Sequence, residues 1–257
     1  IYATGSTAWI RGYGTKIWKS TDTGKNWDLK LNQLDWDVVP FADWGHDRIE
    51  YSGVALDVGW HDGGYESFDL NLRDSEQVGG TGYYFLHTSA DGGEYWDAPF
   101  TEYAGTKSIP TKGDVWKSTG LEVTTVYRFK FHPNNPKVGY AAMADIGGII
   151  TEDGGLTYRN TKIGYNSNYD YAFDPNNDNV VFGVSGSQHD FPMNWHANAA
   201  ENDEGGVYKS TNRGRSWTRL TPTTNNMNRQ FLSLGYDYRR NTLYAGSHGS
   251  GIARSTD

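Results

Sequence analysis

One short pattern recurs along this chain of 257 residues and limits the folds that the chain can adopt. The pattern is Ser/Thr-x-Asp-x-Gly-x-x-aromatic, and we call each copy a turn motif. Four full copies and the start of a fifth occupy residues 20–27, 89–96, 151–158, 210–217 and 255–257. One match to so short a pattern would be noise, but five copies along one chain indicate a repeat protein.

Each residue type in the turn motif predicts a local geometry. The Asp can accept hydrogen bonds from backbone amides two residues further on, as in an Asx turn. The glycine supplies the positive φ of a tight bend, and the aromatic residue anchors the next strand. We therefore expect packing roles for the motif tryptophans and structural roles for the residues at the Asp position, which are Asp22, Asp91, Asp153, Asn212 and Asp257.

The segments around the motifs repeat as well. A strand bounded by glycine precedes four copies, at residues 15–19, 83–87, 206–209 and 251–254. Further upstream, pairs of apolar strands lie at residues 127–131 and 138–142, 171–173 and 180–183, and 234–238 and 242–246. Each unit therefore reads strand A, turn, strand B, loop, strand C, turn motif, strand D. Successive Asp positions lie 69, 62, 59 and 45 residues apart, which fits one four-stranded unit each.

This order predicts an all-β chain that forms a β-propeller of four-stranded antiparallel blades. We assign residues 1–257 to a single β-propeller domain. Strand A of the first unit and strand D of the last are missing. Two alternatives remain, which are a ring of about five blades closed by the termini and, as we prefer, a fragment of a larger propeller.

The repeat resembles the Asp-box (BNR) repeat family, which includes sialidases, sortilin-like receptors, xyloglucan endoglucanases of glycoside hydrolase family 74, and photosystem assembly factors. The resemblance covers nearly the whole chain and implies the propeller fold. It does not name an activity, because these proteins do unrelated things on one scaffold. It implies a secreted or cell-surface location, which the loops rich in Trp, Tyr and Asn also suggest.

Composition excludes several function classes. The net charge is −8 and no basic stripe is visible, which disfavours nucleic acid as a partner. Cysteine is absent, and no apolar run is long enough to predict membrane insertion. No cofactor motif, nucleophile elbow or sialidase Arg-Ile-Pro motif occurs, and no spacing fixes a metal site.

Propeller topology sorts the loops by face. If the turn motif joins strands C and D, the A–B turns lie at the same face, and the B–C and D–A loops emerge together at the other. The A–B turns are short, whereas the D–A loop at residues 34–47 and the B–C loop at residues 186–204 are long and irregular. Long loops gathered at one face predict that this face binds a ligand.

Asp145 is the first catalytic candidate on that face. It follows strand B in the sequence Asp145-Ile146-Gly147-Gly148, which resembles the Asp-(Ile/Val)-Gly-Gly segment of the xyloglucan endoglucanases, where the Asp is catalytic. Those enzymes use two carboxylates. The candidates for the second carboxylate in this chain are Asp190 and Asp47. The alternative is that Asp145 only caps a tight B–C turn.

Aromatic and imidazole side chains on the same loops fit a sugar site. Aromatic faces contact sugar rings while His, Asp and Asn bond the hydroxyls. The candidate substrate-binding residues are Trp36, Trp44, His189, Trp195, His196 and His248, and Trp60 and Trp116 also lie outside the motifs. His189, Asp190 and His196 have no third partner at a metal-ligand spacing, so we assign no metal and no cofactor.

Two functions follow as hypotheses. The first is a carbohydrate-active propeller that cleaves β-glucan or xyloglucan-type polysaccharide by carboxylate acid/base catalysis. The second is a non-catalytic extracellular module of a larger surface protein, which binds glycan or protein through the same loops. The expected partners are a polysaccharide or glycan and other domains of the same protein.

Overall fold

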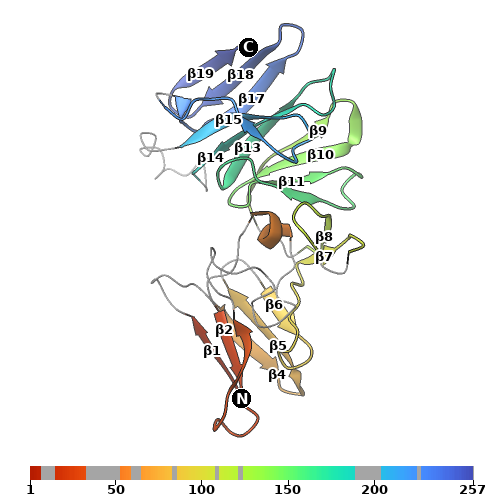
Figure 1. Cartoon of the computed structure of the whole chain (residues 1–257), viewed down its shortest axis with the longest axis vertical. Coiled ribbons are helices and arrows are strands. Elements are labelled where there is room, and N and C mark those ends of the chain that lie inside the picture. Colours follow the sequence, from red (N-terminus) through yellow and green to blue (C-terminus); the bar gives the residue numbers. More distant parts are fainter. Residues whose placement is uncertain are drawn as a thin grey trace. The chain divides into compact units, whose positions relative to one another are not determined.

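The structure is a computed structural model that describes residues 1–6, 15–32, 53–58, 65–82, 86–107, 110–120, 124–188, 204–224 and 227–256. Two compact units divide the chain (Figure 1). The N-terminal unit comprises residues 1–112 and 116–123, and the C-terminal unit comprises residues 113–115 and 124–257. The assignment of one domain to the whole chain stays a prediction.

The N-terminal unit contains small antiparallel sheets. The first has the order β1-β2-β3 and the second the order β4-β5-β6, and β7 pairs with β8 in a hairpin. The strands are β1 (Tyr2–Ser6), β2 (Thr15–Lys19), β3 (Asp28–Asn32), β4 (Tyr65–Asn71), β5 (Asp74–Gly82), β6 (Leu86–Ser89), β7 (Thr101–Tyr103) and β8 (Trp116–Ser118), with one π-helical turn at Val54–Val58.

The C-terminal unit contains three sheets, ordered β12-β11-β10-β9, β13-β14-β15-β16 and β17-β18-β19. The strands are β9 (Val126–His132), β10 (Asn135–Met143), β11 (Gly148–Thr151), β12 (Arg159–Thr161), β13 (Ser167–Phe173), β14 (Val181–Gly186), β15 (Gly205–Ser210), β16 (Thr218–Arg219), β17 (Phe231–Asp237), β18 (Thr242–Ser247) and β19 (Gly251–Ser255).

Within the C-terminal unit the sheets are propeller blades. Each sheet is an antiparallel meander, and its first strand contacts the first strand of the next sheet, as β9 does with β13 and β13 with β17. Apolar side chains fill the space between successive sheets, with Tyr140 and Val181 between the first two and Phe182 and Leu243 between the last two. The predicted all-β class with four-stranded antiparallel blades is therefore confirmed.

The predicted strand positions agree with these sheets. Strands A and B overlap the predicted ranges in all three blades of the C-terminal unit, and strand C does so in the last two. In the second sheet of the N-terminal unit, strand C is Leu86–Ser89, and residues 83–85 of the predicted strand lie outside the described residues. There strand D is reduced to one bridge between Thr88 and Asp97.

The turn motifs share one hydrogen-bond pattern, which corrects one prediction. The carboxylate Oδ1 of Asp22 accepts from the amides of Lys25 and Asn26, at 3.0 and 2.8 Å, and not from the amide two residues on. That amide belongs to Gly24 and donates to the Ser20 hydroxyl at 2.8 Å. The hydroxyl at the head of the motif therefore caps the glycine, and the carboxylate caps the next two amides.

The other motifs repeat this arrangement. The glycine amide donates at 2.8 Å to the head hydroxyl in all three further copies, which are Ser89, Thr151 and Ser210. The glycine φ is positive, as predicted, and so is the φ of the residue before it, at 63° for Thr23 and 59° for Arg213. Two consecutive left-handed residues turn the chain sharply enough to start strand D.

Backbone contacts place the turn motifs at the same end of the sheets as the A–B turns. The amides of Gly92, Gly154 and Arg213 each follow a motif Asp or Asn, and they donate to the carbonyls of Glu76, Lys137 and Asn179. These carbonyls lie at or near the start of strand B. The B–C and D–A loops therefore emerge at the opposite end, as the topology predicts.

The motif tryptophans join neighbouring sheets within a unit. The Trp96 indole donates to Lys30 O of β3 at 3.3 Å, and the Trp217 indole donates to Thr161 Oγ1 of β12 at 3.0 Å. Trp96 is 2% exposed, but Trp27 is 41% exposed, so the packing role predicted for Trp27 is wrong. The reason is that Trp27 belongs to the first sheet, and the described residues include no preceding sheet for it to contact.

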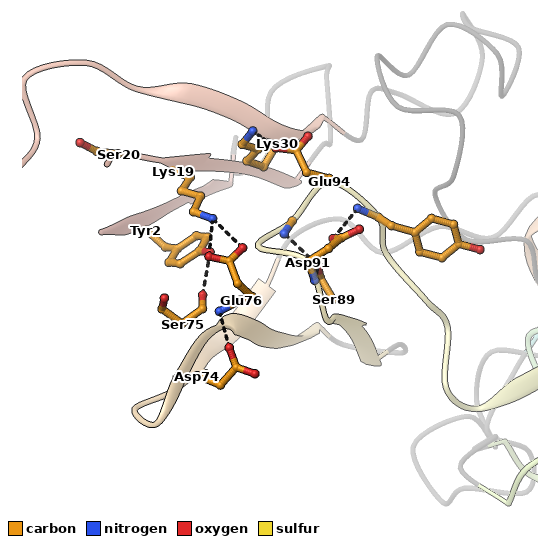
Figure 2. Close-up of polar contacts among 12 residues, drawn as sticks. Tyr2, Lys19, Ser20, Lys30, Asp74, Ser75, Glu76, Ser89, Asp91 and Glu94 are labelled. Atoms are coloured by element: carbon orange, nitrogen blue, oxygen red, sulfur yellow. Dashed lines mark hydrogen bonds and ion pairs between the residues drawn. The ribbon is translucent and has the colours of Figure 1, made fainter. Parts of the chain in front are cut away.

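Polar contacts also link the two sheets of the N-terminal unit (Figure 2). Lys19 of β2 forms an ion pair with Glu76 of β5 at 3.1 Å. The Tyr2 hydroxyl donates to Ser75 O at 3.0 Å. Lys30 of β3 pairs with Glu94 of the second turn motif. Each of these Lys–Glu pairs crosses from the first sheet to the second.

We predict that Asp153→Ala lowers the free energy of unfolding by about 1–2 kcal/mol, because the amides of Leu156 and Thr157 lose their acceptor. Asp153→Asn should cost much less, since Asn212 accepts from the equivalent amides and donates to the Ser216 hydroxyl. Urea denaturation of the two variants measures both. Equal losses would show that the carboxylate charge, and not the acceptor geometry, stabilises the turn.

The same carboxylate predicts an acid dependence of stability. Hydrogen bonds from the Thr157 hydroxyl and from backbone amides lower the pKa of Asp153 from 3.8 to about 2. The stabilisation is therefore complete above the unfolded-state pKa and is lost as the pH falls through about 2. The difference in unfolding free energy between wild type and Asp153→Ala should shrink across this range. A constant difference would contradict this assignment.

Candidate functional site

The candidate site lies at the loop end of the C-terminal unit, where the B–C turn follows β10. The amide of Ala144 donates to Thr125 O, before β9, at 2.9 Å. The amide of Asp145 donates to Ser167 Oγ, at the start of β13, at 3.2 Å. The turn is thus held between the first strands of two successive blades, at the inner edge of the sheets.

The two glycines after Asp145 are required by packing. Gly147 has a φ of +76°, and a Cβ there would lie 2.7 Å from Thr161 O. A Cβ at Gly148 would lie 2.3 Å from Ala141 O and 2.7 Å from the Tyr171 hydroxyl oxygen. Only glycine lets β11 begin this close to β10 and to the next blade.

Asp145 has a left-handed backbone conformation in the B–C turn between β10 and β11. Among the described residues, four non-glycine residues have positive φ, namely Thr23, Asp145, Arg213 and Asn241. Thr23 and Arg213 belong to turn motifs, and Asn241 lies in an A–B turn. Asp145 has a φ of 63° in a B–C turn and is partly exposed. Left-handed backbone costs about 1 kcal/mol outside glycine, and such residues cluster at functional sites.

His248 lies at the same end of the unit. Its amide donates to Gln230 O at 3.0 Å, just as the Ala144 amide donates to Thr125 O. Gln230 and Thr125 each directly precede the first strand of their own blade. The structure therefore brings Asp145 and His248 to one end of the unit, on the B–C turns of its first and third sheets, with the sheet of β13 to β16 between them.

Sequence reasoning missed Gln230. Its side chain is 1% exposed and lies against Gly186, at the end of β14. Among the described residues its Oε1 and Nε2 have no hydrogen-bond partner. Asn166, which holds the equivalent position before β13, has a buried Oδ1 that also lacks a partner within the described residues. Buried amide groups without partners are costly and can bond a ligand or water. Their shared place before strand A is the only signal for them.

Sequence reasoning also missed Arg219, which organises the D–A loop after β16. Its guanidinium donates to Asn228 Oδ1 at 2.8 Å, to Gly205 O at 2.5 Å and to the Tyr165 hydroxyl at 3.4 Å. The guanidinium carbon of Arg219 also lies over the Tyr208 ring, 5.7 Å from the ring centroid. Arg219 therefore fixes the loop that leads to Gln230.

Several predicted site residues cannot be placed. The candidates that lie outside the described residues are Asp47, Asp190, Trp36, Trp44, His189, Trp195, His196, Trp60 and the motif residue Asp257. Trp116 is 1% exposed and packs against Tyr103 with ring centroids 5.2 Å apart, so a ligand-binding role for it is wrong. The hairpin of β7 and β8 buries this indole.

The described residues contain no group of three His, Cys, Asp or Glu side chains that could hold a metal ion. In the same part of the chain, no helix combines the length and the apolar character needed to cross a membrane.

The chain matches no family model and no curated protein. It is similar to solved structures at low identity. An ancestral GH74 enzyme shares 16% identity over 91% of this chain and 26% of that chain, with a TM-score of 0.36. The GH74 xyloglucanase from Xanthomonas campestris shares 14% identity over 100% of this chain and 43% of that chain, with a TM-score of 0.38.

YCF48 from Cyanidioschyzon merolae is similar at 12% identity, over 94% of this chain and 65% of that chain, with a TM-score of 0.32. This chain therefore spans less than half the length of the two GH74 proteins. Because every one of these TM-scores is below 0.5, the likenesses add nothing on activity to what the strands and the site show.

We predict that Asp145→Gly leaves the free energy of unfolding unchanged or raises it by up to about 1 kcal/mol, because glycine adopts the φ of 63° without strain. Urea denaturation measures the change. Gly148→Ala is the matched control in the same turn, and it should be clearly destabilising because its Cβ meets a backbone carbonyl. A loss of more than about 1 kcal/mol for Asp145→Gly would identify Asp145 as a structural turn residue.

Proposed function

We propose that this protein is a secreted or cell-surface, carbohydrate-active propeller whose loop end binds a polysaccharide or glycan. The observation that carries the proposal is Asp145, a partly exposed carboxylate in a left-handed B–C turn that is anchored between two blades. Non-glycine residues with a left-handed backbone cluster at functional sites, which supports a role for Asp145 in chemistry or binding.

The surrounding groups suit hydroxyl-rich ligands. Gln230 and Asn166 supply amide groups before the first strands, and His248 supplies an imidazole from the B–C turn of the third sheet. Amide, imidazole and carboxylate groups together donate to and accept from sugar hydroxyls. The net charge of −8 supports a neutral partner over an anionic one.

In the catalytic form of the proposal, the protein hydrolyses a β-glycosidic bond with two carboxyl groups. One protonates the leaving oxygen while the other, as a carboxylate, activates water on the opposite side of the sugar ring. Asp145 supplies one of them, and Asp190 or Asp47 supplies the other. An inverting reaction needs the two groups about 6.5–9.5 Å apart.

The second candidate is a binding module without turnover, which could be part of a larger surface protein. The hydrogen bond from the Asp145 amide to Ser167 Oγ favours it, because a residue that the turn holds through its backbone can have a structural role that needs no catalytic partner. Both candidate functions use the same loop end. They differ in turnover, so an experiment that measures turnover and binding in parallel separates them.

A reducing-sugar assay on soluble xyloglucan and other β-glucans tests the catalytic form, with binding measured in parallel by affinity electrophoresis. Asp145→Asn should lower turnover by about 10²-fold or more, since it removes an acid or base from the reaction. Asp178→Asn, at an A–B turn of the same unit, makes the same charge change and should leave turnover intact.

Equal product from Asp145→Asn and wild type would remove Asp145 from the mechanism. Binding to a glucan by wild type with no product would support the binding module. If the wild type neither binds nor cleaves any of these glucans, the assignment to this substrate class is contradicted.

A further inference from the structure

The residue at the end of strand A caps the A–B turn in each sheet of the C-terminal unit. Two of these residues are aspartates. Oδ1 of Asp174, directly after β13, accepts from the amide two residues further on at 2.9 Å, and Oδ1 of Asp237, at the end of β17, does the same at 3.1 Å. In the sheet of β9 to β12 the residue is His132, whose Nδ1 accepts from the amide of Asn134 at 3.3 Å.

The strand register shows that these three caps are equivalent. The residue just before each of them pairs with a residue of strand B, and that residue in turn pairs with the first residue of a turn motif. The sheet of β9 to β12 therefore has an imidazole at a position where the other two sheets have a carboxylate. Both side chains accept a hydrogen bond at neutral pH, but only the imidazole gains a proton close to it.

His132 is also more deeply buried than its counterparts. It is 4% exposed, whereas Asp174 and Asp237 are partly exposed. Its ring packs edge-on against Phe173 of β13, with ring centroids 5.1 Å apart. Nε2 is buried and has no hydrogen-bond partner within the described residues. Because Nδ1 accepts a hydrogen bond, the neutral ring carries its proton on Nε2.

The residue that His132 caps joins two A–B turns. The side-chain amide of Asn134 donates to Pro175 O at 2.8 Å and to Asp178 Oδ1 at 2.7 Å, both in the A–B turn of the next sheet. His132 therefore contacts the next sheet through its own ring and, by way of the capped turn, through Asn134. Loss of this cap would loosen the turn end of the contact between these two sheets.

The surroundings of His132 oppose its protonation. Burial lowers the pKa of His132 below its ordinary value of 6.5, Asp178 raises it, and Arg213 of the turn motif after β15 lowers it again, with a net decrease. The folded pKa is thus below the unfolded one. The stability contributed by neutral His132 is therefore complete above about pH 6.5 and is lost as the pH falls below it. A proton on Nδ1 would also replace the acceptor by a donor that faces the Asn134 amide.

We infer that His132 is a pH-sensitive cap, which on protonation in mildly acidic solution releases the Asn134 amide and loosens the A–B turn of its sheet from that of the next. The carboxylate caps do not respond in this range. The hydrogen bond from the Arg240 side chain, for example, lowers the pKa of Asp237, which stays an acceptor. The inference is independent of the proposed carbohydrate site, which lies at the opposite end of the sheets.

Hydrogen exchange of the Asn134 amide, followed by NMR on the full chain, tests the inference across about pH 5–7.5. Protection is expressed relative to the intrinsic exchange rate at each pH. We expect the wild type to lose at least about tenfold in protection at the acid end, since one unit of pKa corresponds to a tenfold change in an equilibrium constant. The imidazole proton shifts of His132 should follow the same titration. Unchanged protection across this range would overturn the inference.

Two variants separate the cap from the packing. His132→Asn keeps a short acceptor but does not titrate, so the Asn134 amide should stay protected at both ends of the range. His132→Phe keeps an aromatic ring against Phe173 without an acceptor, so this amide should exchange quickly at both ends. Circular dichroism shows whether each variant folds.

Each variant also has an outcome that contradicts the inference. Loss of protection by His132→Asn in acid would assign the pH effect to another group. Protection in His132→Phe equal to that of the wild type at neutral pH would show that the imidazole does not cap the turn. If a variant does not fold, the wild-type exchange and the His132 titration still decide the inference, because both must change over the same pH range.

Discussion

The hydrogen bonds inside the turn motif determine where every other part of this structure can lie. The head hydroxyl caps the glycine amide, and the acidic side chain caps the next two amides, so the chain reverses within a few residues. The amide after the Asp also bonds the start of strand B. One end of each sheet is thereby fixed by backbone contacts. Variation in loop length is left to the opposite end, which is where Asp145 and His248 lie.

The strands were predictable because the repeated segments follow the order of the strands in each antiparallel sheet. Strands β9, β10, β13 and β14 lie where the sequence places them. The motif hydrogen bonds were predicted with the wrong amides, because residue types alone do not show that the Ser20 hydroxyl takes the glycine amide before Asp22 can. The exposure of Trp27 was also missed, since burial depends on a neighbouring sheet and not on the motif itself.

The candidate site was only partly predictable, for a related reason. Asp145 stood out because two glycines follow it, and packing explains both glycines without explaining the Asp. Gln230 and Asn166 were missed, because the only signal for them is a place before strand A that different blades share. The side chains of long loops have no such register. Residues such as Asp190 and Trp195 could therefore be named from the sequence as candidates, but no pattern fixes what they contact.

A repeat also provides an internal standard against which each copy can be measured. Tyr140 and Phe182 show what strand B requires at one position for two blades to pack. Gly79 at that position forgoes the burial of an aromatic ring, which is worth about 2 kcal/mol or more. Neighbouring Gln77 and the shortened fourth strand forgo more burial on the same face. At the same position in the third sheet of the C-terminal unit, Tyr244 is 39% exposed, because the described residues include no further sheet of that unit to cover it. The residue type at this position therefore limits how closely two sheets can pack, and the presence of a neighbouring sheet decides whether that residue is buried.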